Sequence, residues 1–219
     1  MPIESRQAAS GGPIREVHRH TFVGVDLDLS IHIDENPQYD AVASLLENAI
    51  TLEFGNPNPP YDSLHTSLYA GDSLIIPITI SNIHTGHSFP SGVSFAREAW
   101  LEAIVINNED SLFLSGFLTS NTMELDMTDT SLLLFTSYLI GENPEDTISS
   151  VSDAHDIINN TLTAFDRRTH FYRLEIPENM TGEIVIQLRM LFRSIKPALI
   201  LAHPDCIDNE NCDLLNNLP

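Results

Sequence analysis

Residues 82–105 read NIHTGHSFPSGVSFAREAWLEAIV and contain two turns, an adjacent Arg-Glu pair and the only tryptophan of the chain. Gly86 and Gly92 stand inside the turns, where we expect a positive φ or a close approach of backbone. From position 98 onward, Trp100, Ala103 and Val105 are set against Leu101 and Ile104, and we expect this stretch to be an alternating strand. Arg97 and Glu98 precede this alternation, and we expect them to form a buried or half-buried ion pair that braces the loop.

Segments on both sides of this stretch also predict strands. Apolar and β-branched runs bounded by turn residues indicate strands over 73–82, 98–106, 111–118, 132–140, 169–176 and 183–192. Residues 98–106 and 111–118 form a hairpin across the turn 107–110, and Trp100 is expected in the core. Six or more short strands with one helix favour a mainly β fold, an antiparallel β-sandwich of the immunoglobulin-like type.

Composition divides the chain into four parts. Residues 1–35 form an N-terminal arm that we expect to dock on a partner. Its residues 1–15 are polar and rich in Gly and Pro, which predicts a linker or an extended arm. Residues 36–55 contain one amphipathic helix, predicted over about 38–52 by apolar residues at helical spacing. Residues 56–200 form the sandwich, with an acidic, Asn/Ser/Thr-rich excursion over 141–165. Residues 201–219 form an acidic tail that contains a Cys loop.

The charge balance excludes several partners. The chain has 31 acidic and 10 basic residues, a net charge of −21. Because phosphate binding needs clustered Lys and Arg, this surface repels nucleic acid and also disfavours anionic membranes. It favours divalent cations and basic partners. No apolar run reaches the roughly 20 residues of a membrane span, and the N-terminus lacks the apolar region of a signal peptide.

The two cysteines, Cys206 and Cys212, are separated by five residues in an acidic stretch. We favour a disulfide over two free thiols, because the flanking residues provide neither a zinc ligand set nor a redox Cys-x-x-Cys. Oxygen ligands crowd this loop, and a disulfide would preorganise them for Ca²⁺. The candidate calcium ligands are Asp205, Asp208, Asn209, Glu210 and Asp213. Their spacing is not that of an EF-hand, so a solvated acidic tail is the favoured alternative.

Histidines are the other candidate ligands. His84 and His87 stand three residues apart, but the adjacent turns favour a structural role for His87 over metal or haem ligation. His18 and His20 would share one face of a strand and could ligate iron or copper, against the alternative of a solvated pair. A metalloenzyme built on the His84/His87 pair would need a third ligand, for which the candidates are Glu98, His155 and His170.

Signatures of several enzyme classes are absent from the sequence. There is no GxSxG, Walker loop, GxGxxG or HExxH motif, and no Cys nucleophile with a nearby His. There is also no Cys-x-x-Cys-His, so the chain cannot attach a c-type haem by itself. We assign no catalytic residue.

The stretch quoted above matches the pattern N-x-x-x-GH-x-x-P-[ST]-G-x(4)-R-E-x-W-L. The matching residues are Asn82, Gly86, His87, Pro90, Ser91, Gly92, Arg97, Glu98, Trp100 and Leu101, followed by Ser115 and Gly116. This pattern resembles the non-haem, β-rich region of bacterial multihaem c-type cytochromes of the cytochrome c554-related kind. Residues 18–26 are similar to an upstream H-x-F-x-G segment, and 188–194 with Pro197 also fit, so the resemblance covers about residues 13–197.

The resemblance implies a non-catalytic accessory domain or fragment of a multihaem cytochrome involved in electron transfer. Such a domain would pack against a haem-bearing segment or subunit, in the periplasm or outside the cell. His18, His20 and His87 would be candidate axial ligands to haem c held by that partner, because this chain binds no haem covalently. The Met1-Pro2 start would follow a final haem motif, with the signal peptide upstream. The alternative is a secreted β-sandwich that binds Ca²⁺, carbohydrate or protein.

Overall fold

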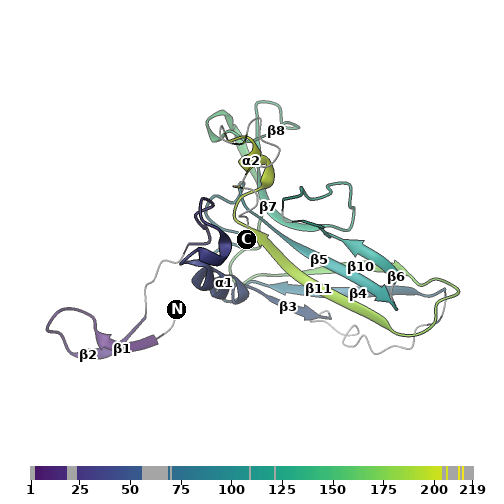
Figure 1. Cartoon of the computed structure of the whole chain (residues 1–219), viewed down its shortest axis with the longest axis horizontal. Coiled ribbons are helices and arrows are strands. Elements are labelled where there is room, and N and C mark those ends of the chain that lie inside the picture. The colour runs from purple at the N-terminus through teal and green to yellow at the C-terminus, as the bar shows by residue number, and fades with distance from the viewer. Residues whose placement is uncertain are drawn as a thin grey trace.

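The computed structural model describes residues 3–18, 24–55, 69, 71–108, 110–120, 122–203, 206, 212 and 214. The described residues are mainly β, with two α-helices and two 3₁₀ turns, η1 (Ile33–Glu35) and η2 (Val151–Asp153). All strand pairs are antiparallel, and two sheets pack into a sandwich, as expected from the sequence (Figure 1). Among these residues, no helix is long and apolar enough to cross a membrane.

The smaller sheet has three strands in the order β10-β4-β3. Their bounds are Arg167–Glu175 for β10, Ser73–Ser81 for β4 and Thr51–Phe54 for β3. The larger sheet has the order β11-β5-β7-β8, with β6 beside β5 and β9 beside β7. Their bounds are Ile184–Arg193 for β11, Glu98–Asn107 for β5, Leu133–Ile140 for β7, Thr147–Ile148 for β8, Asp110–Ser115 for β6 and Asp156–Asn160 for β9.

The main core lies between these two sheets. Ile76, Ile78 and Ile80 alternate along β4 and are at most 1% exposed, because residues two apart point to the same face. On the facing sheet, Leu101 and Val105 of β5 are fully buried. β10 pairs with β4 in an unbroken register over nine residues, and β11 pairs with β5 over ten. This alternation is the reason that the strands could be predicted.

Trp100 is buried, but it does not lie in the main core. It alternates with Leu101 and therefore points to the opposite face of β5. There it forms a second cluster with Leu125 and Leu134, beneath the segment 116–132 that crosses the outer face. The sandwich therefore has a third layer along part of the larger sheet.

The helix α1 (Tyr39–Glu47) is shorter than the expected 38–52. Asn48 caps its C-terminal end, and the chain then enters β3, where Leu52 pairs with Ile80 of β4. Leu52 fits helical spacing as well as strand spacing, so pairing with β4 decides its conformation. A second helix, α2 (Pro197–Leu201), follows the last strand and was not expected.

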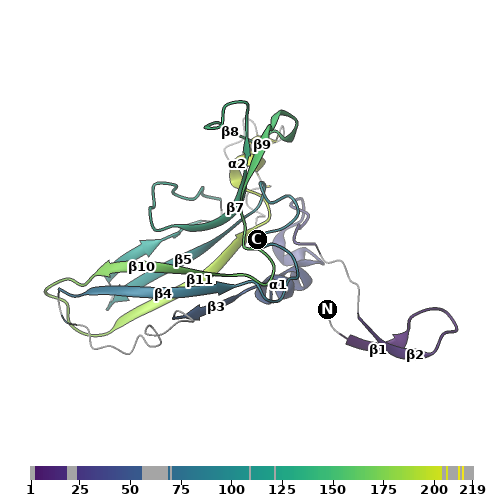
Figure 2. The same cartoon turned by 180° about the vertical axis from the view of Figure 1, so that it is seen from behind.

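The acidic excursion 141–165 is partly ordered into strands. β8 and β9 both pair with the end of β7, so this region extends the larger sheet. Together with α2 it projects from one end of the sandwich (Figure 2).

The first part of the 1–35 segment is a hairpin of β1 (Ile3–Gln7) and β2 (Ile14–His18), where the sequence indicated a linker or an extended arm, and from here on the arm means residues 1–23. Its strands pair with each other over five residues each. Figures 1 and 2 both show the hairpin standing apart from the sandwich. Of the described residues, none outside the hairpin adds a strand to either of its edges.

Candidate functional site

The loop 82–92 is organised around Asn82, which is completely buried. Its Nδ2 donates hydrogen bonds to the carbonyl oxygens of His87 at 2.7 Å and of Leu162 at 3.0 Å. Its Oδ1 accepts a hydrogen bond from Oγ1 of Thr85 at 2.6 Å. One side chain thus joins the loop to the distant segment that follows β9, so the Asn-x-x-x-Gly-His pattern has a structural explanation.

Arg97 joins this loop to the segment that follows the arm. Its Nη2 donates to Oδ2 of Asp26 at 2.7 Å, and its Nη1 donates to the carbonyl oxygen of Ser91. Gly92 has a φ of +71°, and a Cβ at that position would lie 2.8 Å from Nη1 of Arg97. The positive φ therefore favours glycine at this position, and a Cβ there would displace the guanidinium of Arg97.

The prediction of an ion pair between Arg97 and Glu98 is wrong. Glu98 pairs instead with Arg193 of β11, because adjacent residues at the start of a strand point in different directions. Both partners are buried, and Arg193 also donates to the carbonyl oxygen of Met123 at 2.7 Å and lies 4.9 Å from the Trp100 ring centre. Burial raises the pKa of the Glu98 carboxyl above its usual value, and the charge of Arg193 opposes this shift.

Trp100 and Gly116 pack together on the outer face of β5. The indole Nε1 of Trp100 donates to the carbonyl oxygen of Gly116 at 2.9 Å. Gly116 has a φ of +62°, and a Cβ there would lie 2.7 Å from the carbonyl oxygen of Leu101. The matching Trp100 and Gly116 are thus parts of one packed layer, which Arg193 of the Glu98–Arg193 pair also contacts through the Trp100 ring.

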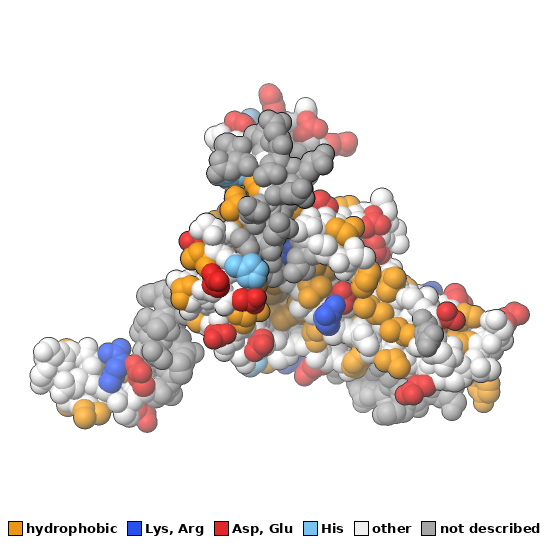
Figure 3. All heavy atoms as spheres, viewed as in Figure 1, with side chains coloured by type: hydrophobic (Ala, Val, Ile, Leu, Met, Phe, Trp, Pro, Cys, Tyr) orange, Lys and Arg blue, Asp and Glu red, His pale blue; other side chains and the backbone are white. Residues whose placement is uncertain are grey.

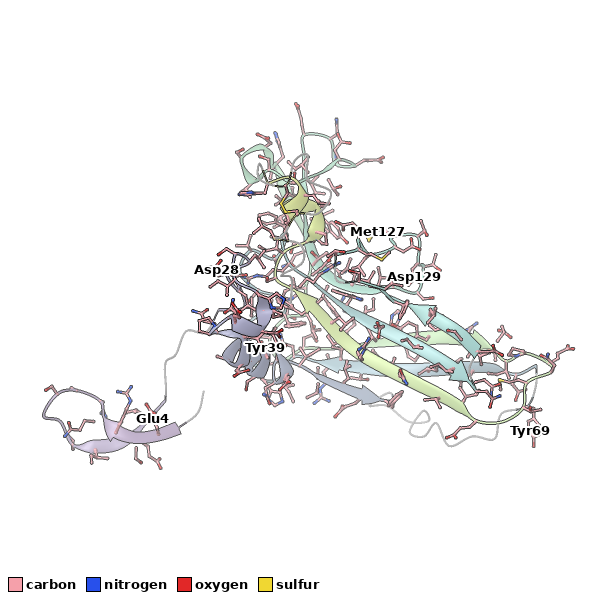
Figure 4. The ribbon with its side chains drawn as sticks, viewed as in Figure 1. Glu4, Asp28, Tyr39, Tyr69, Met127 and Asp129 are labelled. Atoms are coloured by element: carbon pink, nitrogen blue, oxygen red, sulfur yellow. A yellow bond between two sulfur atoms is a disulfide. The ribbon has the colours of Figure 1, made fainter. Side chains whose placement is uncertain are left out.

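A polar cluster that the sequence did not indicate lies beside this layer. Oδ2 of Asp129 accepts hydrogen bonds from Oγ of Ser115 at 2.8 Å and from the backbone N–H of Gly116 at 2.9 Å. His170 and Tyr172 of β10 are in ring contact, with centres 4.6 Å apart. Burial lowers the pKa of His170 and raises that of Tyr172, so both rings are neutral at pH 7. Figure 4 shows Asp129 in the loop on the outer side of the larger sheet.

An apolar hollow of about 420 Å³ separates α1 from the edge of the sandwich. Tyr39 lies at its rim on α1 (Figure 4). The other lining residues come from the segment after the arm, from α1, from β3, from the motif loop and from β11: Val25, Leu27, Val42, Ala43, Leu46, Glu47, Ile50, Leu52, Phe89, Met190, Leu191 and Phe192. The hollow therefore adjoins both the motif loop and the residues that follow the arm.

The candidate axial histidines lie on different elements. His18 ends β2, and neither its side chain nor His20 belongs to the described part of the chain. His87 is exposed in the motif loop, with Nδ1 3.0 Å from the carbonyl oxygen of Ser88. Among the described residues, no three His, Cys, Asp or Glu side chains are grouped so that they could hold a metal ion. The third ligands considered for His84 and His87 are therefore not brought to that pair.

Cys206 and Cys212 form a disulfide, with their Cα atoms 5.2 Å apart. Both cysteines are buried against Ile200 of α2. The five candidate calcium ligands, Asp205, Asp208, Asn209, Glu210 and Asp213, all lie outside the described residues.

Comparisons with known proteins assign no family. No protein-family model matches the chain, and no curated protein matches it. A solved structure that resembles it is a penta-heme cytochrome c552 from Thermochromatium tepidum, with a TM-score of 0.48 and 15% sequence identity. The match covers 72% of this chain and 35% of that chain. Likeness at this level assigns no function.

Proposed function

We propose that this chain is a non-catalytic accessory domain of a multihaem c-type cytochrome, attached to the haem-bearing segment or subunit by its N-terminal arm. The observation that carries the proposal is the isolation of that arm. Within the described residues, the extensive contacts of the β1–β2 hairpin are those between its own two strands. A lone two-stranded hairpin is marginally stable in water, so this arm requires a partner to stay ordered.

The arm also presents a surface suited to a partner. Ile14, at the start of β2, is 72% exposed although it is a large aliphatic residue. An exposed isoleucine on a strand with open edges favours pairing with another polypeptide. The arm is connected to the sandwich through residues 24–29, where Asp26 binds Arg97.

The haem-bearing nature of the partner is supported by the resemblance of the motif residues. Asn82, Gly92 and Arg97 have defined packing or hydrogen-bonding tasks in the motif loop. Trp100 and Gly116 have such tasks on the outer face of β5. A pattern in which each of these residues has a structural task is less prone to chance matching than a short motif. The net charge of −21 further favours a partner with a basic docking face.

His18, His20 and His87 are proposed as axial ligands to haems of the partner. His87 is suited to this role because its ring is exposed and its Nδ1 approaches the Ser88 carbonyl oxygen. A carbonyl that accepts from Nδ1–H fixes the tautomer in which Nε2 has the free lone pair for iron. His18 and His20 are proposed from their position in the arm.

Attachment is tested by purifying the tagged full-length chain from its own cells and staining the denatured eluate for covalent haem. We expect a haem-stained partner with the wild-type chain and its loss with Ile14→Glu. Ile157→Glu is the matched control, because Ile157 is also an exposed isoleucine but lies on β9. Absence of any haem-stained partner from the wild-type eluate would contradict the proposal.

The axial ligands are tested by an optical titration with a proteolytic c-type haem peptide that has one open axial position. We expect a change to a low-spin, bis-histidine spectrum, weakened by His18→Ala, His20→Ala or His87→Ala. His84→Ala is the control, since His84 is exposed in the same loop. If all three variants titrate like the wild type, these histidines are not ligands.

The disulfide supports an oxidising compartment for the protein, because disulfides persist mainly in the periplasm and outside the cell. We therefore propose a periplasmic or extracellular location. Treatment of intact cells with a thiol reagent, before and after reduction, would distinguish an oxidised from a reduced Cys206–Cys212 pair. A fully reduced pair in fresh cells would contradict this location.

A further inference from the structure

One side of the sandwich is bordered by the edge strands of both sheets. Among the described residues, β11 pairs with β5 alone and β3 pairs with β4 alone. β11 runs over ten residues, whereas β3 runs over four. No strand of the described chain therefore covers the outer main-chain edge of β11, which displays alternating N–H and C=O groups.

An apolar groove follows this open edge. A second hollow, of about 500 Å³, lies between the two edge strands and contacts Leu52 and Phe54 of β3 and residues 186–189 of β11. It shares Leu52 with the hollow beneath α1, which continues along β11 over residues 190–192. Together the two hollows border β11 from 186 to 192, a distance of about 20 Å at ~3.3 Å per residue. Figure 3 shows apolar side chains gathered along this face.

Within the described residues, the edge has few of the features that prevent pairing with another strand. Soluble proteins usually protect such edges with charged side chains, prolines, bulges or a covering segment. The charge in the middle of β11 is Arg189, whose Nη2 lies 2.7 Å from Oε1 of the buried Glu102. Val185 is 44% exposed and Phe54, across the groove, is 53% exposed. A long edge with an apolar groove beside it is typical of sites that accept an added strand.

We propose that the β11 edge binds an extended segment of another protein, which pairs with β11 and inserts alternate apolar side chains into the groove. The rim of the groove favours a positively charged segment, because Glu47 and Glu53 are exposed there and the guanidinium of Arg189 is paired with Glu102. The bound segment therefore has basic residues at its flanks. A second copy of this chain is disfavoured as the occupant, since each copy has a net charge of −21. This binding site does not depend on whether the partner contains haem.

The test uses a synthetic fluorescent peptide in which valine and threonine alternate between flanking pairs of lysines. Fluorescence anisotropy should show saturable binding that weakens with added salt, and amide hydrogen exchange should slow in 184–192. A peptide of the same sequence, N-methylated at every amide of the alternating run, keeps the side chains but cannot donate to β11. We expect this peptide not to bind.

Two protein variants locate the site. Phe54→Lys, at the groove, should weaken binding at least about tenfold, as the loss of an aromatic anchor does. Phe117→Lys is the matched control, because Phe117 is 44% exposed on the loop over the outer face and the charge change is identical. Equal binding of the methylated peptide, equal loss in both variants, or protection away from β11 would each overturn the proposal. So would light scattering that shows a concentration-dependent dimer with β11 protected, because the occupant would then be a second copy.

Discussion

Removing either partner of the buried pair Glu98–Arg193 should destabilise the protein far more than removing both. The two residues are only 4% and 1% exposed, so either single change leaves a charge buried without its counterion. Such a loss costs about 3–5 kcal/mol of unfolding free energy. Arg193→Met also gives up the hydrogen bond to the Met123 carbonyl and the contact with the Trp100 ring. We therefore expect both Arg193→Met and Glu98→Gln to fall in this range.

The assay is a double-mutant cycle measured by urea unfolding and followed by circular dichroism. The Glu98→Gln/Arg193→Met variant should be more stable than additivity predicts by about 2–3 kcal/mol, because the residues are in direct contact. A control cycle pairs Glu98→Gln with Arg97→Met, whose guanidinium binds Asp26 instead. That cycle should show a much smaller coupling, because the Arg97 guanidinium bonds Asp26 and the Ser91 carbonyl oxygen and does not pair with Glu98. An additive 98/193 cycle, or a coupling between positions 97 and 98 of the same size, would refute this assignment of the ion pairs.

Three further changes test the outer layer, the polar cluster and the tail. Trp100→Ala should lower the free energy of unfolding by about 3–5 kcal/mol, measured by urea unfolding. Trp100→Phe should lower it by about 1–2 kcal/mol, since phenylalanine keeps most of the buried area but lacks the indole donor. A loss below about 1 kcal/mol for Trp100→Ala would place Trp100 at the surface. Burial lowers the pKa of His170, so the unfolded chain binds more protons than the folded one below pH ~6.5. The unfolding free energy of the wild type should therefore fall relative to that of His170→Gln as the pH drops from there through the lowered pKa. Parallel profiles for the wild type and His170→Gln would contradict this. For the acidic tail, millimolar Ca²⁺ should change the melting temperature of the protein no more than millimolar Mg²⁺ does. A rise that is specific to Ca²⁺ and abolished by Asp208→Asn would favour a calcium-binding module over a cytochrome accessory domain.

The strands were predictable because burial imposes a two-residue period on the sequence. Ile76, Ile78 and Ile80 show this period clearly, and they face the main core as expected. The same period was harder to interpret around Trp100, since both faces of β5 are buried and both are largely apolar. Only the position of the segment 116–132 reveals that Trp100 belongs to an outer layer.

Long-range partners were not predictable in the same way. Sequence adjacency suggested a pair between Arg97 and Glu98, whereas their actual partners are Asp26 and Arg193, far away along the chain. Ion pairs depend on which side chains the sheets bring together, and a single sequence does not contain that register. The cluster around His170 was missed for the same reason, because Asp129 reaches it from a loop.

Local signals also misled at two boundaries. Leu52 continued the helical spacing of α1, yet its residue pairing with β4 makes it part of a strand. In the arm, the Gly and Pro residues suggested a linker, whereas Gly12 belongs to the turn between β1 and β2. Both elements are short, and short elements take their conformation from tertiary contacts more than from propensity.

The account depends most on the arm as a docking element, which amide hydrogen exchange measures directly. Exchange should be compared over residues 3–18 in the free chain and in the complex isolated from cells, with β4 and β5 as internal references. The account predicts near-unprotected exchange of the arm in the free chain and strong protection in the complex. Protection of the free arm equal to that of β4, unchanged in the complex, would contradict it.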